Sequence, residues 1–190
     1  ARYPDIQVDL GVSDRMVDLI GDNVDCVIRG GELTDQSLVA RRIGNLDFIT
    51  VASPDYLQRK GTPGHPVEIE QKHTSVIYFS AQSGRHYPLE FRQGDESIDI
   101  TGPYQLSVNE SNAYVTSLVA GLGIGQISTF QAQRHFRQGT LVQLLPEWTQ
   151  PPLPVYVVYP PNRHLSAKVR AFVDWAAELF QRETALQKTA

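Results

Sequence analysis

The segment from residue 109 to residue 125 limits the folds that this chain can adopt. It begins with the polar residues Asn109, Glu110 and Ser111, continues as a short amphipathic stretch, and ends in a Gly-x-Gly-x-Gly run at 121–125. This order predicts a helix with a polar start, a glycine stop and then a buried strand. Because the first N–H groups of a helix lack partners, they can hold an anion or a polar ligand. The segment carries no nucleophile or general base, so it indicates binding.

The same glycine run superficially matches a nucleotide-binding loop. Dinucleotide loops follow a strand and open a helix, whereas this run follows a helix and precedes a strand, so we reject that interpretation. The five histidines show no metal-ligand spacing, and no Gly-x-Ser-x-Gly motif occurs. Cys26 lies in an apolar run and is expected to be a small buried hydrophobe. We therefore predict that the chain is not an enzyme and needs no metal or cofactor.

Strand and helix patterns alternate over the whole chain, which predicts an α/β fold. Residues 6–10 alternate apolar and polar side chains, Ser13 can cap a helix that ends at Gly21, and 24–28 is a compact apolar run. This unit predicts two parallel strands joined by a right-handed crossover. Further strands are expected at 38–43, 46–52, 74–79, 89–92, 97–101, 105–108, 125–127, 141–145 and 155–159, and further helices at 54–60, at 129–137 and after Ser166.

Charge and cysteine usage restrict the environment and the partners. The 190-residue chain has a net charge of −4, whereas a nucleic-acid-binding surface is normally basic. No apolar run is long enough to cross a bilayer, and no secretory signal is visible. A single cysteine excludes an internal disulfide and favours a reducing compartment. We expect a cytoplasmic protein that does not contact DNA with this segment.

Several phrases, in their order and spacing, resemble the effector-binding domain of LysR-type transcriptional regulators. The resemblance extends from residue 1 to about residue 182. It rests on Tyr3-Pro4-Asp5-Ile6, Val24-Asp25-Cys26-Val27-Ile28-Arg29, Leu38-Val39-Ala40-Arg41-Arg42-Ile43-Gly44, Val51-Ala52-Ser53-Pro54-Asp55-Tyr56-Leu57, Ala120-Gly121-Leu122-Gly123-Ile124-Gly125, Gly139-Thr140-Leu141-Val142 and the closing segment 154–180.

The resemblance implies two Rossmann-like subdomains joined by two crossover strands, as in type 2 periplasmic binding proteins, with an effector in the cleft between them. Subdomain I is then 1–50 with 154–183, subdomain II is 51–153, and 184–190 is a C-terminal tail. The family's winged helix-turn-helix, its linker helix, and the first strand and helix of the effector domain are not in this sequence. Without that strand, neighbouring strand edges are expected to be exposed and prone to aggregation.

Subdomain I is expected to supply three effector-binding residues. Ser13 follows the first strand at a helix start, and the alternative is a plain N-cap. Arg29 could hold a carboxylate through two hydrogen bonds, and Gly30 would let the backbone approach a ligand. The alternative for Arg29 is a surface ion pair with Glu32 or Asp35.

Subdomain II is expected to supply four more. Ser80 ends a strand at the sheet edge where α/β folds collect ligands, and the alternative is an ordinary loop serine. Asn109 is predicted to cap the helix of the opening segment, with Ser111 in its first turn. Ser128 ends one strand and starts a helix. For Asn109 and Ser128 the alternative is a purely structural cap.

The resulting hypothesis is the sensory half of a bacterial transcriptional regulator that binds a small organic anion. The resemblance implies a dimer of this domain, a tetramer of the full-length protein, and contact with promoter DNA only through the N-terminal domain that this sequence lacks. The pairing surface is expected near residues 13–29 and 109–122. A solute-binding protein, which shares the two-lobed architecture, is the alternative, and a small enzyme on a related fold is a distant third.

Overall fold

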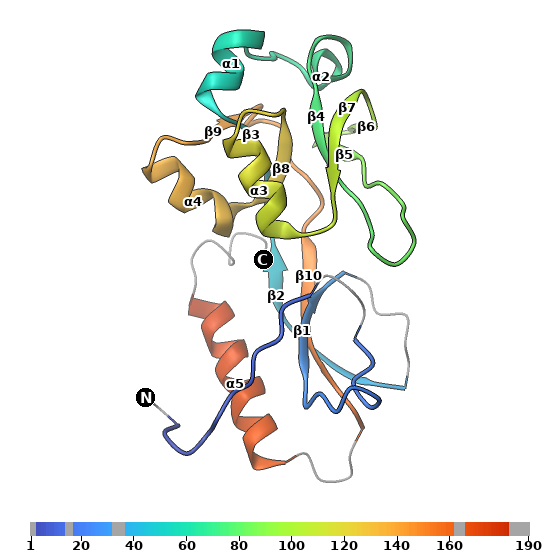
Figure 1. Cartoon of the computed structure of the whole chain (residues 1–190), viewed down its shortest axis with the longest axis vertical. Helices are drawn as coiled ribbons and strands as arrows, with labels where there is room; N and C mark the ends of the chain where they lie inside the picture. Colours follow the sequence, from blue (N-terminus) through green and yellow to red (C-terminus); the bar gives the residue numbers. More distant parts are fainter. Residues whose placement is uncertain (1–2, 14–16, 32–36, 162–165, 183–190) are drawn as a thin grey trace. The chain divides into compact units, whose positions relative to one another are not determined.

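The computed structural model describes residues 3–13, 17–31, 37–161 and 166–182 (Figure 1). The helices are α1 (Pro54–Lys60), α2 (Pro66–Lys72), α3 (Ser111–Val119), α4 (Thr129–Arg137) and α5 (Ala167–Arg182). The strands are β1 (Val27–Gly30), β2 (Val39–Leu46), β3 (Phe48–Ala52), β4 (Ser75–Tyr78), β5 (Leu89–Gln93), β6 (Glu96–Ile100), β7 (Tyr104–Val108), β8 (Gly125–Ser128), β9 (Val142–Leu144) and β10 (Leu153–Tyr159). Among these helices, none has the length and apolar character needed to span a membrane.

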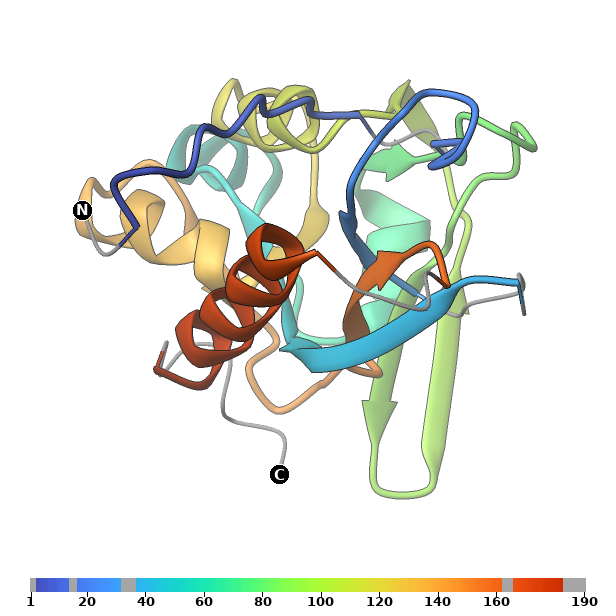
Figure 2. The same cartoon turned by 90° about the horizontal axis from the view of Figure 1, so that it is seen from below.

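The chain forms two compact units. Unit 1 contains the described residues up to 45 and from 153 onwards, and unit 2 contains residues 46–152. In unit 1 the strands follow the order β1-β10-β2, with β1 antiparallel to β10. Helix α5 lies along this sheet and buries Val169, Val173 and Ala176, which recur at helical spacing on one face (Figure 2). The hydroxyl of Ser166 accepts a hydrogen bond from the N–H of Val169 at 3.3 Å, so it caps this helix as expected.

The first part of unit 1 differs from the prediction. Residues 6–10 form no strand, and the predicted parallel crossover is wrong because β1 pairs with β10 in the antiparallel sense. A strand needs a neighbouring strand that pairs with its backbone groups, and among the described residues 6–10 take part in no strand pairing; the N–H of Ile6 instead donates to the carbonyl of Tyr3 at 3.4 Å. The expected helix after Ser13 falls partly on 14–16, outside the described residues, and residues 19–23 form a turn.

The unpaired segment displays an apolar stripe to solvent. Val8, Leu10 and Val12 are 63%, 82% and 80% exposed. Exposed alternating apolar side chains promote association between chains. We therefore expect serine at all three positions to reduce self-association, measured by light scattering, and to leave the melting temperature unchanged because no folded contact is lost. As a control, Val157→Ser in the buried part of β10 should lower the melting temperature. A fall of more than a few degrees in the triple variant would contradict the prediction.

Unit 2 is built on two groups of strands that share one junction. Strand β3 lies between β8 and β9 and is antiparallel to both, and β4 is parallel to β7. The N–H of Ile124, just before β8, donates to the carbonyl of Thr74 at 2.9 Å, and its carbonyl accepts from the N–H of Val76 at 3.0 Å. These bonds place β8 beside β4 in the parallel sense. Consequently β7, β4 and β8 all point the same way.

Side chains on the two faces of this sheet form two separate cores. Neighbouring residues on a strand point to opposite faces, and Val51 and Ala52 of β3 accordingly belong to different apolar clusters. The cluster of Val51 includes Tyr114 and Leu118 of α3. The cluster of Ala52 includes Ile69 of α2 together with the following residues of α1, the β5–β6 hairpin and the segments around β8 and β9: Tyr56, Leu89, Phe91, Ile100, Ile124, Leu144, Leu145 and Trp148.

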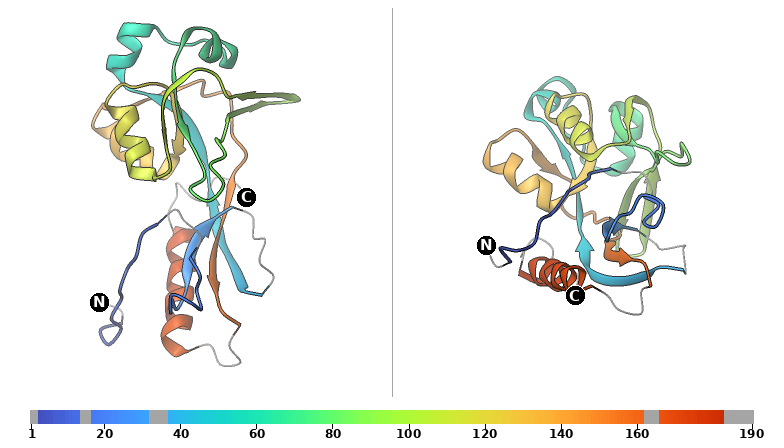
Figure 3. Two further views of the ribbon diagram at one scale, coloured as in Figure 1. Left: turned by 45° about the vertical axis from the view of Figure 1, so that its right-hand side comes forward. Right: turned by 60° about the horizontal axis from the view of Figure 1, so that its bottom comes forward.

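The β5–β6 hairpin extends outward from the rest of unit 2 (Figure 3). Its strands are joined by the two residues Gly94 and Asp95, with Gly94 at a φ of 55°. Leu89, Phe91 and Ile100 of the hairpin are buried, so one face packs on the core and the other faces solvent.

The strands and helices predicted from residue 38 onwards are present, with ends that agree or are shifted by up to three residues, the largest shift being at the end of β2. Helix α1 spans the predicted residues 54–60, with Ser53 as its N-cap and Gly61 as its C-cap. Helix α2 was not predicted. Its start resembles that of α1, because Pro66 occupies the first helical position as Pro54 does in α1, but its cap is a histidine, which is less usual there than serine.

Candidate functional site

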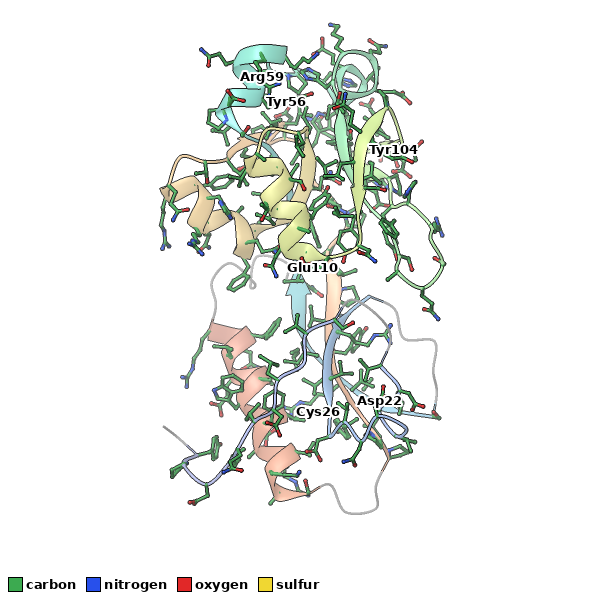
Figure 4. The ribbon with its side chains drawn as sticks, in the orientation of Figure 1. Asp22, Cys26, Tyr56, Arg59, Tyr104 and Glu110 are labelled. Carbon is green, nitrogen blue, oxygen red and sulfur yellow. The ribbon has the colours of Figure 1, made fainter. Side chains whose placement is uncertain are left out.

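Three parallel strands of unit 2 end at one edge of its sheet, which we call the carboxyl edge. Ser80 and Asn109 follow the neighbouring strands β4 and β7, and the N–H of Phe79 donates to the carbonyl of Val108 at 2.9 Å. Ser128 is the last residue of β8. Helices α3 and α4 begin here, and the start of α3 is marked by Glu110 in Figure 4. The structure therefore brings Ser80, Asn109, Ser111 and Ser128 to the same edge, where open α/β sheets bind ligands.

The cap of α3 is Glu110, so the prediction that Asn109 caps this helix is wrong. The two carboxylate oxygens of Glu110 accept hydrogen bonds from the N–H groups of Asn112 at 2.9 Å and Ala113 at 2.7 Å. These two backbone N–H groups hold the pKa of the Glu110 carboxyl below its usual range. A glutamate side chain is long enough to reach both donors from the cap position. The protein's own carboxylate thus fills the place that the sequence suggested for an anion.

Ser128 caps α4 and is buried. Its hydroxyl accepts from the N–H of Gln131 at 3.3 Å and donates to the side-chain oxygen of Gln131 at 3.1 Å. The neighbouring N–H of Thr129 donates to the carbonyl of Asp47 at 2.8 Å. The capping alternative thus accounts for the contacts of Ser128. Its hydroxyl is hydrogen-bonded to Gln131 at the carboxyl edge, where β8 ends.

Ser80 organises the loop between β4 and β5. Its hydroxyl accepts from the N–H groups of Gln82 at 3.3 Å and Ser83 at 3.2 Å. Its own N–H donates to the carbonyl of Arg85 at 2.9 Å, which closes the loop. The ring of His86 at the end of this loop packs edge-on against Tyr104 at 5.0 Å between centroids. The loop is therefore held in a defined shape beside the carboxyl edge.

The other predicted residues lie in unit 1. Ser13 is exposed and follows the unpaired segment. Arg29 and Gly30 lie on β1 opposite Tyr156 and Val155 of β10. A Cβ atom on Gly30 would lie 2.6 Å from a methyl carbon of Leu153, so a larger residue there would require the Leu153 side chain to shift. The alternative partners of Arg29, Glu32 and Asp35, fall outside the described residues.

Two buried polar side chains that sequence reasoning missed hold the strands of the carboxyl edge in place. The Tyr114 hydroxyl donates to the carbonyl of Val76 at 3.0 Å and accepts from the N–H of Gln126 at 3.1 Å. The Gln126 side chain donates to the carbonyl of Glu90 at 2.7 Å and accepts from the N–H of Glu90 at 3.0 Å. A glutamine inside an otherwise apolar strand was the available signal, because buried amides must be paired.

Two observations concern the metal-ligating and nucleophilic side chains among the described residues. Among them, no group of three or more His, Cys, Asp or Glu side chains could hold a metal ion. Burial, followed by the negative charge of Asp25, raises the pKa of the Cys26 thiol. A thiol with a raised pKa is a poor nucleophile because the thiolate is the reactive form.

Comparisons with known proteins agree on one family. A model of the LysR substrate binding domain matches residues 1–181. An HTH-type transcriptional repressor of Pseudomonas aeruginosa is 36% identical over 189 residues, which is 100% of this chain and 59% of that protein. The uncharacterized HTH-type transcriptional regulator YhjC of Escherichia coli is 36% identical over 181 residues, with 92% of this chain and 58% of that protein covered.

Solved structures give the same result. The regulatory domain of CrgA, a LysR-type transcriptional regulator from Neisseria meningitidis, is 27% identical with a TM-score of 0.81, over 94% of this chain and 86% of that one. The full-length virulence activator AphB of Vibrio cholerae is 28% identical with a TM-score of 0.77, over 94% of this chain and 59% of that one. The chain spans about six tenths of the length of the Pseudomonas aeruginosa repressor and of YhjC.

Proposed function

The chain belongs to the LysR substrate-binding domain family, and from this premise we propose that it binds a small organic anion and that this binding regulates the transcriptional activity of a larger protein. As an effector-binding domain of LysR-type regulators it has the mixed α/β fold of type 2 periplasmic binding proteins and is not an enzyme. The regulators reported above support the transcriptional role over the solute-binding alternative.

We propose that the effector contacts the carboxyl edge of unit 2. The observation that carries this proposal is the common end of β4, β7 and β8, with two helix starts beside it. Because Glu110 already pairs with the first N–H groups of α3, the donors proposed for an anionic effector are side chains, foremost the amide of Asn109 and the hydroxyl of Ser111. Ser80, Ser128 and, from unit 1, Ser13, Arg29 and Gly30 complete the proposed set.

The rest of the proposal concerns the larger protein. The two compact units would correspond to the two subdomains of the family. The domain would pair with a second copy, the full-length protein would form a tetramer in the cytoplasm, and a separate N-terminal domain would contact promoter DNA. The net charge of −4 supports the last point, because it disfavours a direct contact between this segment and DNA. Effector binding would act on transcription only through a difference in affinity between two arrangements of the protein.

The effector site can be tested with Asn109→Leu. The probes are a panel of aliphatic and aromatic mono- and dicarboxylates at neutral pH, screened by thermal shift, and the Kd of a stabilising compound is then measured by calorimetry. We expect Asn109→Leu to weaken that Kd at least about tenfold, because the leucine cannot donate to the anion and a lost charge-assisted hydrogen bond is worth this much.

A matched control is Gln133→Leu on the exposed side of α4, which should bind as the unmodified protein does. Both variants should melt cooperatively at nearly the unmodified temperature, because neither side chain is part of the core. Unchanged affinity in Asn109→Leu would contradict the assignment of the carboxyl edge.

A further inference from the structure

Helix α2 has a histidine at each end. The imidazole Nδ1 of His65 accepts a hydrogen bond from the N–H of Val67 at 3.3 Å and so caps the start of the helix. His73 occupies the other cap, where its N–H donates to the carbonyl of Ile69 at 3.2 Å. The helix has only seven residues, and a helix this short depends on its ends and its packing.

The cap at His65 requires a nitrogen without a proton. Only an unprotonated Nδ1 can accept the N–H of Val67, so a doubly protonated ring loses this bond. The other ring nitrogen lies 3.9 Å from a carboxylate oxygen of Glu96 on β6, and the ring packs edge-on against Trp148 at 5.2 Å between centroids. From α2 itself, Glu68 bonds to the N–H of Gly64 at 2.7 Å. A proton on Nδ1 therefore breaks the cap, while the carboxylate of Glu96 remains beside the ring.

The ring of His73, by contrast, lies inside the protein. It is 5% exposed, and its Nδ1 lies 3.3 Å from the hydroxyl of Tyr56 on α1. That hydroxyl accepts from the N–H of Thr74 at 2.9 Å, which leaves its own proton to donate to Nδ1 or, at 3.4 Å, to the carbonyl of Thr74.

Charge around His73 also opposes protonation. The pKa of His73 is lowered by burial, which outweighs the opposite effect of Glu68, and the positive charges of Lys72 and Lys60 lower it further. A histidine that is buried in its neutral form stabilises the folded state above its unfolded pKa of about 6.5, and this stabilisation is lost as the pH falls below that value.

We propose that α2 is a pH-sensitive element of unit 2, which stays docked while His65 and His73 are neutral and separates from the core when both gain protons. The part of the core that it covers is specific. Ile69 of α2 is fully buried in the cluster with Tyr56 and Phe91, so release of the helix uncovers apolar side chains of α1 and β5. Acid would thus change the surface of unit 2 independently of any effector.

Native-state hydrogen exchange followed by NMR tests this proposal. Protection factors of the α2 amides, which correct for the intrinsic pH dependence of exchange, are compared at about pH 7.5 and about pH 5.5. We expect them to fall by at least about tenfold at the lower pH, because the loss of the His65 cap alone has an effect of this order. The doubly substituted variant His65→Asn with His73→Gln keeps an acceptor at both positions and should show protection that does not change with pH.

Two single variants make the test decisive. His65→Asn alone changes an exposed side chain to a good cap and should fold normally, with a smaller loss of protection at low pH than the unmodified protein. His86→Asn, in the exposed loop before β5, should keep the full loss. Equal protection of α2 at both pH values in the unmodified protein, or an undiminished loss in His65→Asn, would overturn the proposal.

Discussion

Gly123→Ala is expected to destabilise unit 2 by about 3 kcal/mol, a large effect for one added methyl group. A Cβ atom at Gly123 would lie 2.5 Å from the carbonyl oxygen of Thr74 and 3.1 Å from the carbonyl carbons of Thr74 and Ser75. All three atoms belong to the backbone, so no side chain can rotate away. The junction between β4 and the start of β8 must open, and the hydrogen bond from the N–H of Ile124 to the carbonyl of Thr74 must lengthen.

Urea unfolding followed by circular dichroism measures this effect. Gly64→Ala is the matched control in the same unit, because its added Cβ would meet only a side-chain oxygen of Glu68 at an ordinary 3.6 Å. We expect the control to change the free energy of unfolding by less than about 0.5 kcal/mol. A Gly123→Ala variant as stable as the control would show that the strands can separate without cost, which would refute the tight junction.

The glycine run shows what the sequence could and could not predict. A helix stop was predictable, because Gly121 has a φ of 73° and glycine is the residue that adopts this conformation readily at a helix end. The need for glycine at positions 123 and 125 was not predictable from the sequence. Those two positions are set by the backbone of β4 and by the Tyr114 hydroxyl, which would lie 2.5 Å from a Cβ at Gly125. Close approach between segments distant in sequence leaves no local pattern.

The candidate site shows the same division. Patterns of caps and strand ends correctly predicted that Ser80, Asn109 and Ser128 lie at the ends of strands, because strand and turn signals are local. The position of the α3 cap was wrong by one residue. Asn109 and Glu110 both lie next to the helix start. Which of them caps the helix depends on the backbone conformation between the end of β7 and α3. The strand predicted at 6–10 failed for a related reason, since alternation predicts a strand only where a neighbour pairs with it.

Tyr114→Phe is expected to cost about 2 kcal/mol although it removes one oxygen atom. The hydroxyl is the partner of both the Val76 carbonyl and the Gln126 N–H, and the tyrosine is 5% exposed. Without it, two buried backbone groups on neighbouring strands lose their partners, and a buried unpaired group costs more than an ordinary hydrogen bond gains. Tyr104→Phe is the control, because that exposed side chain lies at the start of β7 and should tolerate the change within about 0.5 kcal/mol.

The same hydroxyl should dominate the stability of unit 2 in alkali. Burial raises the pKa of Tyr114 to about 12, above the value of about 10 for an exposed tyrosine. The folded state therefore holds this proton more tightly than the unfolded state, and stability falls as the pH rises from about 10 towards 12, by about 1.4 kcal/mol per pH unit. In Tyr114→Phe this part of the pH dependence should disappear, whereas Tyr104→Phe should keep it. Urea midpoints measured at about pH 9 and about pH 11 distinguish the two variants. If the midpoint changed equally with pH in both variants, the Tyr114 proton would not be held by the folded structure.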